Sequence, residues 1–250
     1  MSAAGYYASR AALEHYLFFH YGEARDYLPF PGSPKRSMHY PARAVRALLD
    51  RSKLPARARA LDLGCATGAS SFELSRSCHE VLGVDLSRQF IRAANQLKRA
   101  GRIDVNVVIE GDRRRRVTLK TPAGTHPDRI TFRHGDAMHL PRTMTGYDVV
   151  VMLNLIDRLP DPAACLTDVV DRINPGGQLI IASPYTWMEE YTPKRKWLGG
   201  RAGQSTREAL EKLLSPSCKL LRTRQIPFIL REHARKYQWS MAEGTCWQRR

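Results

Sequence analysis

The chain has 250 residues, of which 43% are hydrophobic and 26% charged, with 17 glycines and 15 prolines. This composition fits one large globular domain, residues 1–250, and excludes collagen-like, mucin-like and disordered chains. A formal net charge of +16 favours anionic partners or simply solubility, and says little about the fold. Five cysteines without a CxxC pair, short apolar runs and no signal-peptide pattern predict a cytoplasmic protein with reduced thiols and no membrane contact.

The first part of the chain is predicted to be helical. Residues 6–22 carry apolar and aromatic side chains at helical spacing. Residues 28–41 are rich in Pro, Gly and Ser and should be irregular, and a second helix is expected at 42–51. We therefore expect residues 1–52 to form a helical cap on the domain that follows.

From residue 58 onward, strand and helix patterns alternate. Such alternation predicts parallel strands with right-handed crossovers, hence an α/β fold with a doubly wound, mostly parallel sheet of seven strands. The last two strands should form an antiparallel edge. The expected strands are 58–63, 80–84, 130–134, 147–153, 177–183, 226–232 and 237–247. The expected helices between them are 70–77, 89–99 and 162–172.

Residues 103–122 interrupt the alternation. Two alternating runs, 106–110 and 117–120, flank a turn signal at Gly111 and Asp112, which predicts an inserted basic hairpin. The four arginines at 113–116 should lie at or just past its tip. They are either a solvated charge run or a nucleic-acid contact.

A glycine-containing loop follows the first predicted strand, in the sequence ALDLGCATG at residues 60–68. Its glycines let the backbone approach a ligand at the carboxyl edge of a sheet, and it is neither a Walker loop nor a GxGxxG turn. The pattern resembles the first motif of the class I S-adenosylmethionine (SAM) methyltransferases, with Ala66 where that family has its central glycine. The resemblance assigns the cofactor loop to Asp62, Gly64, Cys65, Ala66 and Gly68.

Later segments match the same family in the same order. Asp85 ends the next strand, 23 positions after Asp62, where a carboxylate can accept both ribose hydroxyl hydrogens; a helix N-cap is the structural alternative, although Ser87 suits it better. The segment at 154–157, Asn-Leu-Ile-Asp, usually faces the transferred methyl group and differs from the motif of base-amine methyltransferases. The resemblance implies a SAM-dependent enzyme that releases S-adenosylhomocysteine. It adds six cofactor-binding residues: Asp85, Leu86, Asp136, Ala137, Asn154 and Leu155.

Segments outside this shared core resemble the N-methyltransferases of ovothiol biosynthesis, over about residues 6–247. They are YLFFHYG at 16–22, residues 154–162, SPYTWMEEYTP at 183–193, KWLGG at 196–200 and REHARKYQW at 231–239. The resemblance implies N-methylation of the imidazole ring of 5-thiohistidine (4-mercaptohistidine). In many relatives this module is fused to an iron-dependent sulfoxide synthase. His15 and His20 lie five apart, off the spacing of helix ligands, so we expect no metal site and a separate synthase as pathway partner.

The resemblance also suggests where the substrate binds. Residues 184–215 would form a substrate-side insertion, with Glu190, Tyr185 and Asp157 as polar groups that anchor the substrate or fix the imidazole tautomer. The expected substrate-binding residues are Tyr16, His20, Tyr21, Trp187, Glu189, Tyr191 and Trp197. The structural alternatives are that the aromatic residues belong to the core or the sheet edge, and that Glu189 and Glu190 are solvated.

Two other functions compete with this interpretation. The net charge and the four arginines would suit an RNA methyltransferase, but no RNA-binding module accompanies the fold, so we expect no nucleic-acid partner. A non-catalytic scaffold with a SAM fold is the second alternative. The intact set of Asp62, Gly64, Gly68 and Asp85 argues against it.

Overall fold

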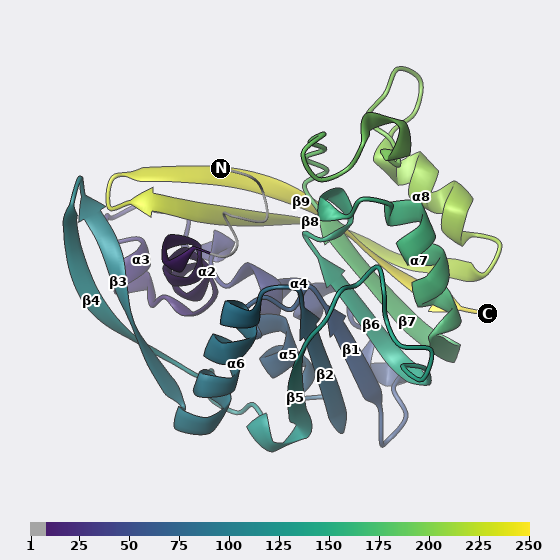
Figure 1. The fold of residues 1–250 in the computed structure, drawn as a ribbon, viewed down its shortest axis with the longest axis horizontal. Coiled ribbons are helices and arrows are strands. Elements are labelled where there is room, and N and C mark those ends of the chain that lie inside the picture. Colours follow the sequence, from purple (N-terminus) through teal and green to yellow (C-terminus); the bar gives the residue numbers. More distant parts are fainter. Residues whose placement is uncertain (1–8) are drawn as a thin grey trace.

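The structure, a computed structural model, describes residues 9–250. Its main sheet has seven strands in the order β5-β2-β1-β6-β7-β9-β8 (Figure 1). The first five are parallel, and β9 and β8 add an antiparallel edge, which confirms the doubly wound α/β prediction. The strands are β1 (Arg59–Leu63), β2 (Glu80–Asp85), β5 (Ile130–His134), β6 (Tyr147–Leu153), β7 (Ile173–Ser183), β8 (Cys218–His233) and β9 (Lys236–Arg249).

Helices cover both faces of this sheet, and each face has its own hydrophobic core. Along β6, Val149 and Val151 belong to the core beneath α4, α5 and α6, whereas Val150 and Met152 belong to the core beneath α7 and α8. Strand side chains alternate between faces, so a strand buried on both sides is apolar throughout. The helices are α2 (Arg10–Tyr21), α3 (Ala24–Tyr27), α4 (Tyr40–Leu48), α5 (Ala69–Leu74), α6 (Arg88–Ala100), α7 (Pro162–Asp171) and α8 (Thr206–Leu214).

The N-terminal helices differ from the prediction at their ends. The hydroxyl of Ser9 caps α2 by accepting from the amide of Ala12, and residues 6–8 of the predicted helix lie outside the described residues. Helix α4 occupies Tyr40–Leu48 rather than 42–51, because the chain turns extended at Leu49 and Asp50 caps the next short turn, η2 (Arg51–Lys53). The interval 28–41 is irregular as expected, apart from η1 (Lys35–Ser37) and the start of α4 at Tyr40.

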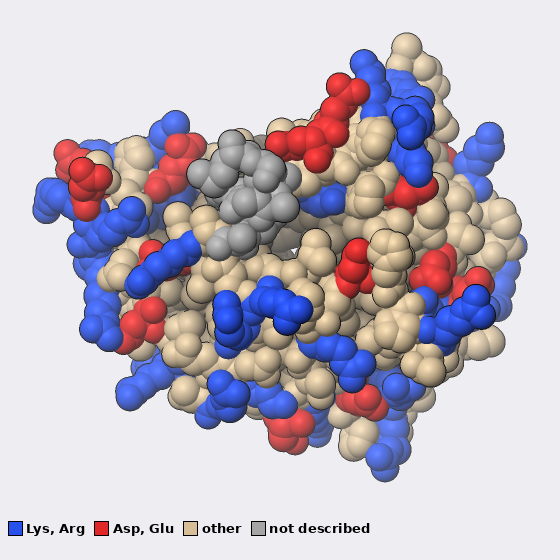
Figure 2. Space-filling view, in the orientation of Figure 1, with Lys and Arg blue, Asp and Glu red and all other residues tan. Residues whose placement is uncertain are grey.

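The interruption is a hairpin, β3 (Arg102–Glu110) and β4 (Arg113–Lys120), which forms a separate antiparallel sheet beside α2 (Figure 1). Its four arginines open β4. Three of them pair with acids: Arg113 with Glu110, Arg115 with Asp26 and Arg116 with Asp104. Figure 2 shows basic and acidic side chains interleaved along this hairpin.

All five cysteines are buried free thiols. Within residues 9–250, no helix is both long enough and apolar enough to cross a membrane.

Candidate functional site

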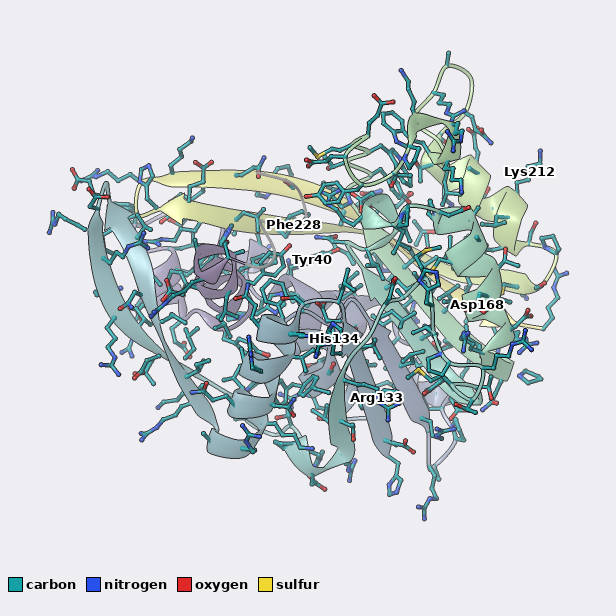
Figure 3. All side chains as sticks on the ribbon, in the orientation of Figure 1. Tyr40, Arg133, His134, Asp168, Lys212 and Phe228 are labelled. Atoms are coloured by element: carbon teal, nitrogen blue, oxygen red, sulfur yellow. The ribbon has the colours of Figure 1, made fainter. Side chains whose placement is uncertain are left out.

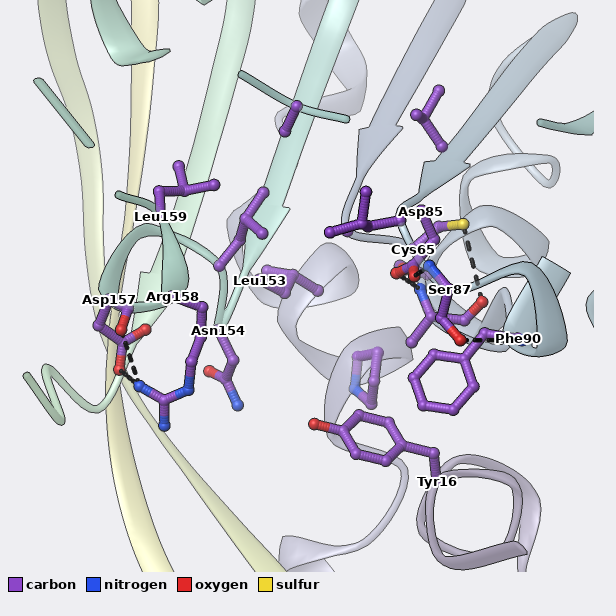
Figure 4. A pocket seen from close by; sticks show the side chains of 18 of the residues that line it. Tyr16, Cys65, Asp85, Ser87, Phe90, Leu153, Asn154, Asp157, Arg158 and Leu159 are labelled. Carbon is purple, nitrogen blue, oxygen red and sulfur yellow. Dashed lines mark hydrogen bonds and ion pairs between the residues drawn. The ribbon is translucent and has the colours of Figure 1, made fainter. Parts of the chain in front are cut away.

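A cavity of about 1110 Å³ lies at the carboxyl ends of the parallel strands. Doubly wound folds bind ligands at this edge, where the strand order reverses between β1 and β6. Helix α2 and the β8–β9 hairpin also line the cavity. Elements from early and late in the sequence therefore meet around it. Figure 4 shows Asp85 and Ser87 on one side, and Asn154, Asp157 and Arg158 on the other.

The loop after β1 approaches the cavity with its backbone. Gly64 has φ +69°, and a β-carbon there would lie 3.0 Å from Cδ1 of Leu155, which lines the same cavity. Three non-glycine residues also adopt left-handed conformations just after parallel strands: Ala66, Asn154 and Tyr185. Such strain costs of order 1–3 kcal/mol per residue and clusters at ligand sites. The loop therefore brings its backbone close to the cavity, as a ligand-binding loop does.

Asp85 faces the cavity from the end of β2. Its Oδ2 accepts from the amide of Ala66 at 2.9 Å and its Oδ1 from the amide of Ser87 at 2.7 Å, while burial raises the pKa of its carboxyl group. Each oxygen has a further lone pair for a ligand hydroxyl. Ser87, not Asp85, caps α6, so the cap alternative does not account for Asp85. Leu86, 66% exposed, lines the cavity next to it and offers an apolar surface to a ring.

Asp62, Gly68 and Tyr21 support the loop from behind instead of lining the cavity. Asp62 is buried and accepts from the hydroxyls of Ser70 and Ser71, and burial raises its pKa to about 6. A β-carbon on Gly68 would lie 2.5 Å from Cζ of Phe132, so glycine is required for packing. The Tyr21 hydroxyl donates to the carbonyl of Thr67 at 2.7 Å.

Other predicted cofactor residues do line the cavity. Cys65 is a buried thiol whose pKa is raised by burial. Asp136 and Ala137 follow β5, and the Asp136 carboxylate accepts from the amide of Met138 at 2.8 Å and contacts Nδ1 of His139 at 2.8 Å. These contacts fix the loop that the resemblance assigns to the cofactor.

The end of β6 holds the most constrained polar groups. Asn154 has φ +51°, and its Oδ1 accepts from the hydroxyl of Tyr40 at 2.8 Å. Asp157 lies in η4 (Ile156–Arg158) and is 1% exposed; its Oδ2 accepts from the amide of Thr186 at 3.0 Å and from Nη1 of Arg158 at 3.1 Å.

The other carboxylate oxygen of Asp157, Oδ1, has no hydrogen bond of normal geometry within residues 9–250. Burial raises the pKa of Asp157, and the Arg158 guanidinium and the nearby Ser183 hydroxyl partly offset that rise. Asp157 lines the cavity as a residue, whereas Oδ1 itself is shielded from the cavity by its neighbours.

The predicted substrate residues divide into two groups. Tyr16, His20, Glu190 and Tyr191 line the cavity. Tyr185, Trp187, Glu189 and Trp197 do not, although all four belong to the described chain. Tyr185 donates its hydroxyl to Glu243 at 2.7 Å.

The prediction that Trp187 and Trp197 are cavity walls is corrected. Their rings stack on each other at 6.3 Å. Their indole N–H groups donate to Oγ1 of Thr206 and to the carbonyl of Thr192. Both tryptophans are half-buried, and their hydrogen-bond partners lie within the 184–215 segment itself.

Sequence reasoning missed residues contributed by distant elements. Tyr40 on α4 and Phe228 on β8 lie with their ring centroids 4.8 Å apart at the cavity (Figure 3). Further lining residues that were not predicted individually are His15, Phe19, Arg158, Leu230, Gln238 and Ser240. Within residues 9–250, no three His, Cys, Asp or Glu side chains gather to hold a metal ion.

Comparison with known proteins agrees with this geometry. A family described as a methyltransferase domain matches residues 61–179. The chain is 30% identical over 130 residues to a demethylmenaquinone methyltransferase of Lactiplantibacillus plantarum, and 28% identical over 144 residues to a 27-O-demethylrifamycin SV methyltransferase of Amycolatopsis mediterranei. These matches cover 51% and 55% of this chain but only 45% and 44% of the two relatives.

A solved structure extends the likeness over almost the whole chain. The N-methyltransferase NodS of Bradyrhizobium japonicum, in complex with S-adenosylhomocysteine, superposes with a TM-score of 0.54 at 15% identity and covers 95% of this chain and 98% of that one. At that identity the likeness shows the fold. Residues 61–179 therefore match a methyltransferase domain, and the chain as a whole shares the fold of that N-methyltransferase.

Proposed function

We propose that the protein transfers the methyl group of SAM to an imidazole nitrogen of 5-thiohistidine. The observation that carries the proposal is that Asp157 lines the cavity at the methyl-transfer edge, where a carboxylate can face a ring N–H. The segments that resemble ovothiol N-methyltransferases support it. Several of their residues line the cavity, among them Tyr16, His20, Asp157, Glu190 and Gln238.

The residues on the β1–β2 side fit the cofactor. Asp85 would accept from the ribose hydroxyls, Gly64 and Ala66 would let the methionine end approach the backbone, and Leu86 would cover the adenine. When bound, SAM supplies an electrophilic methyl carbon. The protein therefore needs to orient a nucleophile rather than to activate the methyl group.

The substrate side would prepare the imidazole. An imidazole is about half protonated near pH 6.5, so a neutral ring nitrogen is available at neutral pH without a strong base. Asp157 would accept the opposite ring N–H, which fixes the tautomer and turns the lone pair toward the methyl group. Glu190 lies exposed at the cavity and suits the substrate ammonium group.

The hairpin arginines do not favour an RNA substrate. Three of the four are paired with Glu110, Asp26 and Asp104, which reduces the charge that they present to a phosphate backbone.

Mass spectrometry of 5-thiohistidine, histidine and histidylcysteine sulfoxide, each incubated with the enzyme and SAM, tests the proposal. Free 5-thiohistidine should be methylated about 100-fold faster than histidine, because misplacement of a nucleophile by about 1 Å costs about that much. Asp157→Asn should lower the rate while SAM affinity stays constant, and Asp112→Asn in the hairpin turn should change neither. Equal rates on histidine and its thiol would refute the substrate assignment while leaving methyl transfer standing.

A further inference from the structure

We infer that Arg158 binds the α-carboxylate of the substrate and so selects a free amino acid over an imidazole without a carboxylate. The inference rests on the proposed function and adds a specificity-determining residue to it. Arg158 was not among the individually predicted residues, because nothing in its local sequence distinguishes it from a surface arginine.

The position of Arg158 is the first support. It lies in η4, immediately after the strand that ends at the methyl-transfer edge, and its side chain is 25% exposed. It lines the cavity, and Figure 4 shows it extending beside Asn154, opposite Asp85.

The guanidinium is held in place by the protein. Its Nη1 donates to the carbonyls of Asp157 and Thr186, both at 2.8 Å, and to Oδ2 of Asp157 at 3.1 Å. Its central carbon lies 4.7 Å from the centroid of the Tyr191 ring. A group fixed in this way loses little further conformational entropy when a ligand binds, which favours its use in recognition.

The charges around Arg158 complement a zwitterionic imidazole amino acid. The other two arginines that line the cavity, Arg88 and Arg92, belong to α6 on the Asp85 side. Among the described lining residues that follow β6 and β7, the charged groups are Asp157, Arg158 and Glu190. Two acids and one cation match a substrate with two N–H donors, the ammonium and the ring, and one carboxylate.

The planar fork of the guanidinium favours a carboxylate over the substrate's thiolate. Arginine binds two oxygens of one carboxylate through parallel N–H groups, a geometry that a single sulfur cannot use. The thiolate is therefore the competing partner that the experiment must separate.

The test measures KM and kcat for wild type and Arg158→Gln with 5-thiohistidine, with its decarboxylated amine 5-thiohistamine, and with histidine. Arg158→Gln should raise the KM for 5-thiohistidine about 10- to 100-fold, the range of a charge-assisted hydrogen bond, and change kcat much less. The KM for 5-thiohistamine should stay constant, so the preference for the carboxylate disappears. The KM of Arg158→Lys for 5-thiohistidine should lie between those of wild type and Arg158→Gln. The control Arg114→Gln, on the exposed face of β4, should have the KM of wild type.

Each other result has a defined meaning. An equal rise in KM for both thiols would overturn the inference, since Arg158 would then serve the cavity wall alone. If Arg158→Gln leaves the KM for histidine unchanged, Arg158 contacts the thiolate and not the carboxylate. That result would also overturn the inference. Inactivity of wild type on both thiols, with normal SAM binding, would refute the proposed function and the inference together. Calorimetric SAM affinity verifies folding, and Arg158→Lys replaces Arg158→Gln if the latter does not fold.

Discussion

At the residue scale, Asp85 combines two tasks. Its carboxylate holds the amides of Ala66 and Ser87 and also faces the cavity, so one side chain shapes the cofactor loop and would bind the ribose. Asp85→Ala should weaken SAM binding by at least about 10-fold, because each charge-assisted hydrogen bond contributes about 1.5–3 kcal/mol. Isothermal titration calorimetry measures this, with Asp112→Ala as the control. Unchanged SAM affinity would place the cofactor elsewhere.

Gly64 is required for both its conformation and the space around it. Gly64→Val should lose about 1–3 kcal/mol of stability, because a branched residue is strained at φ +69°, and should abolish SAM binding by filling the loop next to Leu155. Gly101→Val is the matched control. Gly101 has φ +68° and no neighbour within 4 Å of a β-carbon, at the end of α6.

Both glycine variants should therefore lose stability in denaturant unfolding, Gly64→Val the more because Leu155 crowds the new side chain, while only the Gly101 variant retains SAM affinity in calorimetry. If Gly64→Val folds and binds SAM normally, the loop does not form the cofactor site.

At the element scale, the strands and the strand-end motifs could be predicted from the sequence, because burial on both faces imposes long apolar runs and turns require glycine. Asp85 and Asp157 lie at or just after the ends of such strands, and both line the cavity. The orientation of Trp187 could not be predicted, since its N–H partner, Thr206, lies 19 residues away. Phe228 belongs to an ordinary alternating strand, and nothing local distinguishes a cavity wall from a core face.

Helix α4 reaches the methyl-transfer edge through one hydroxyl. Tyr40→Phe removes the donor to Oδ1 of Asn154 and should lower stability by about 1 kcal/mol and kcat severalfold, because the strained Asn154 is no longer held. Tyr27→Phe is the control: this buried hydroxyl lies away from the cavity, donates to the carbonyl of Ile229 at 2.9 Å and accepts from the amide of Arg231 at 3.0 Å. Urea unfolding should show a loss of stability in both variants, larger in Tyr27→Phe, and steady-state kinetics should show a kcat effect only in Tyr40→Phe. If kcat fell equally in Tyr40→Phe and Tyr27→Phe, the Tyr40 hydroxyl would contribute to stability alone and not to the positioning of Asn154.

At the scale of the whole molecule, the cavity depends on contacts between the two ends of the chain. Residues of α2, α4 and β8 share one hydrophobic core with β1 and β6. Tyr27 bonds to Ile229 across 202 positions, and the end of α2 bonds to the glycine loop through Tyr21 and His20. The same contacts stabilise the fold and complete the cavity. A substitution that weakens them should therefore lower the free energy of unfolding of the whole domain.

His20 makes that link dependent on pH. It is 6% exposed, its Nδ1 lies 2.8 Å from Oγ1 of Thr67, and burial, reinforced by His15 and His39, lowers its pKa to about 3. Below about pH 6.5 the His20 imidazole is protonated in the unfolded chain but stays neutral in the folded protein. The free energy of unfolding therefore falls as the pH drops. From pH 7 to pH 5 this amounts to about 2 kcal/mol.

His20→Gln should cost about 1 kcal/mol at pH 7 through the lost hydrogen bond, and should not share the acid-induced loss. The raised pKa of Asp62, about 6, acts in the opposite direction, because its ionised form is disfavoured in the folded state; it is present in both proteins and cancels in their difference. Urea unfolding at the two pH values should therefore show the stability difference shift by about 2 kcal/mol, from about 1 kcal/mol in favour of wild type at pH 7 to about 1 kcal/mol in favour of the variant at pH 5. The exposed His126→Gln serves as control, and a constant difference between wild type and His20→Gln would mean that His20 is protonated equally in the folded and unfolded chains.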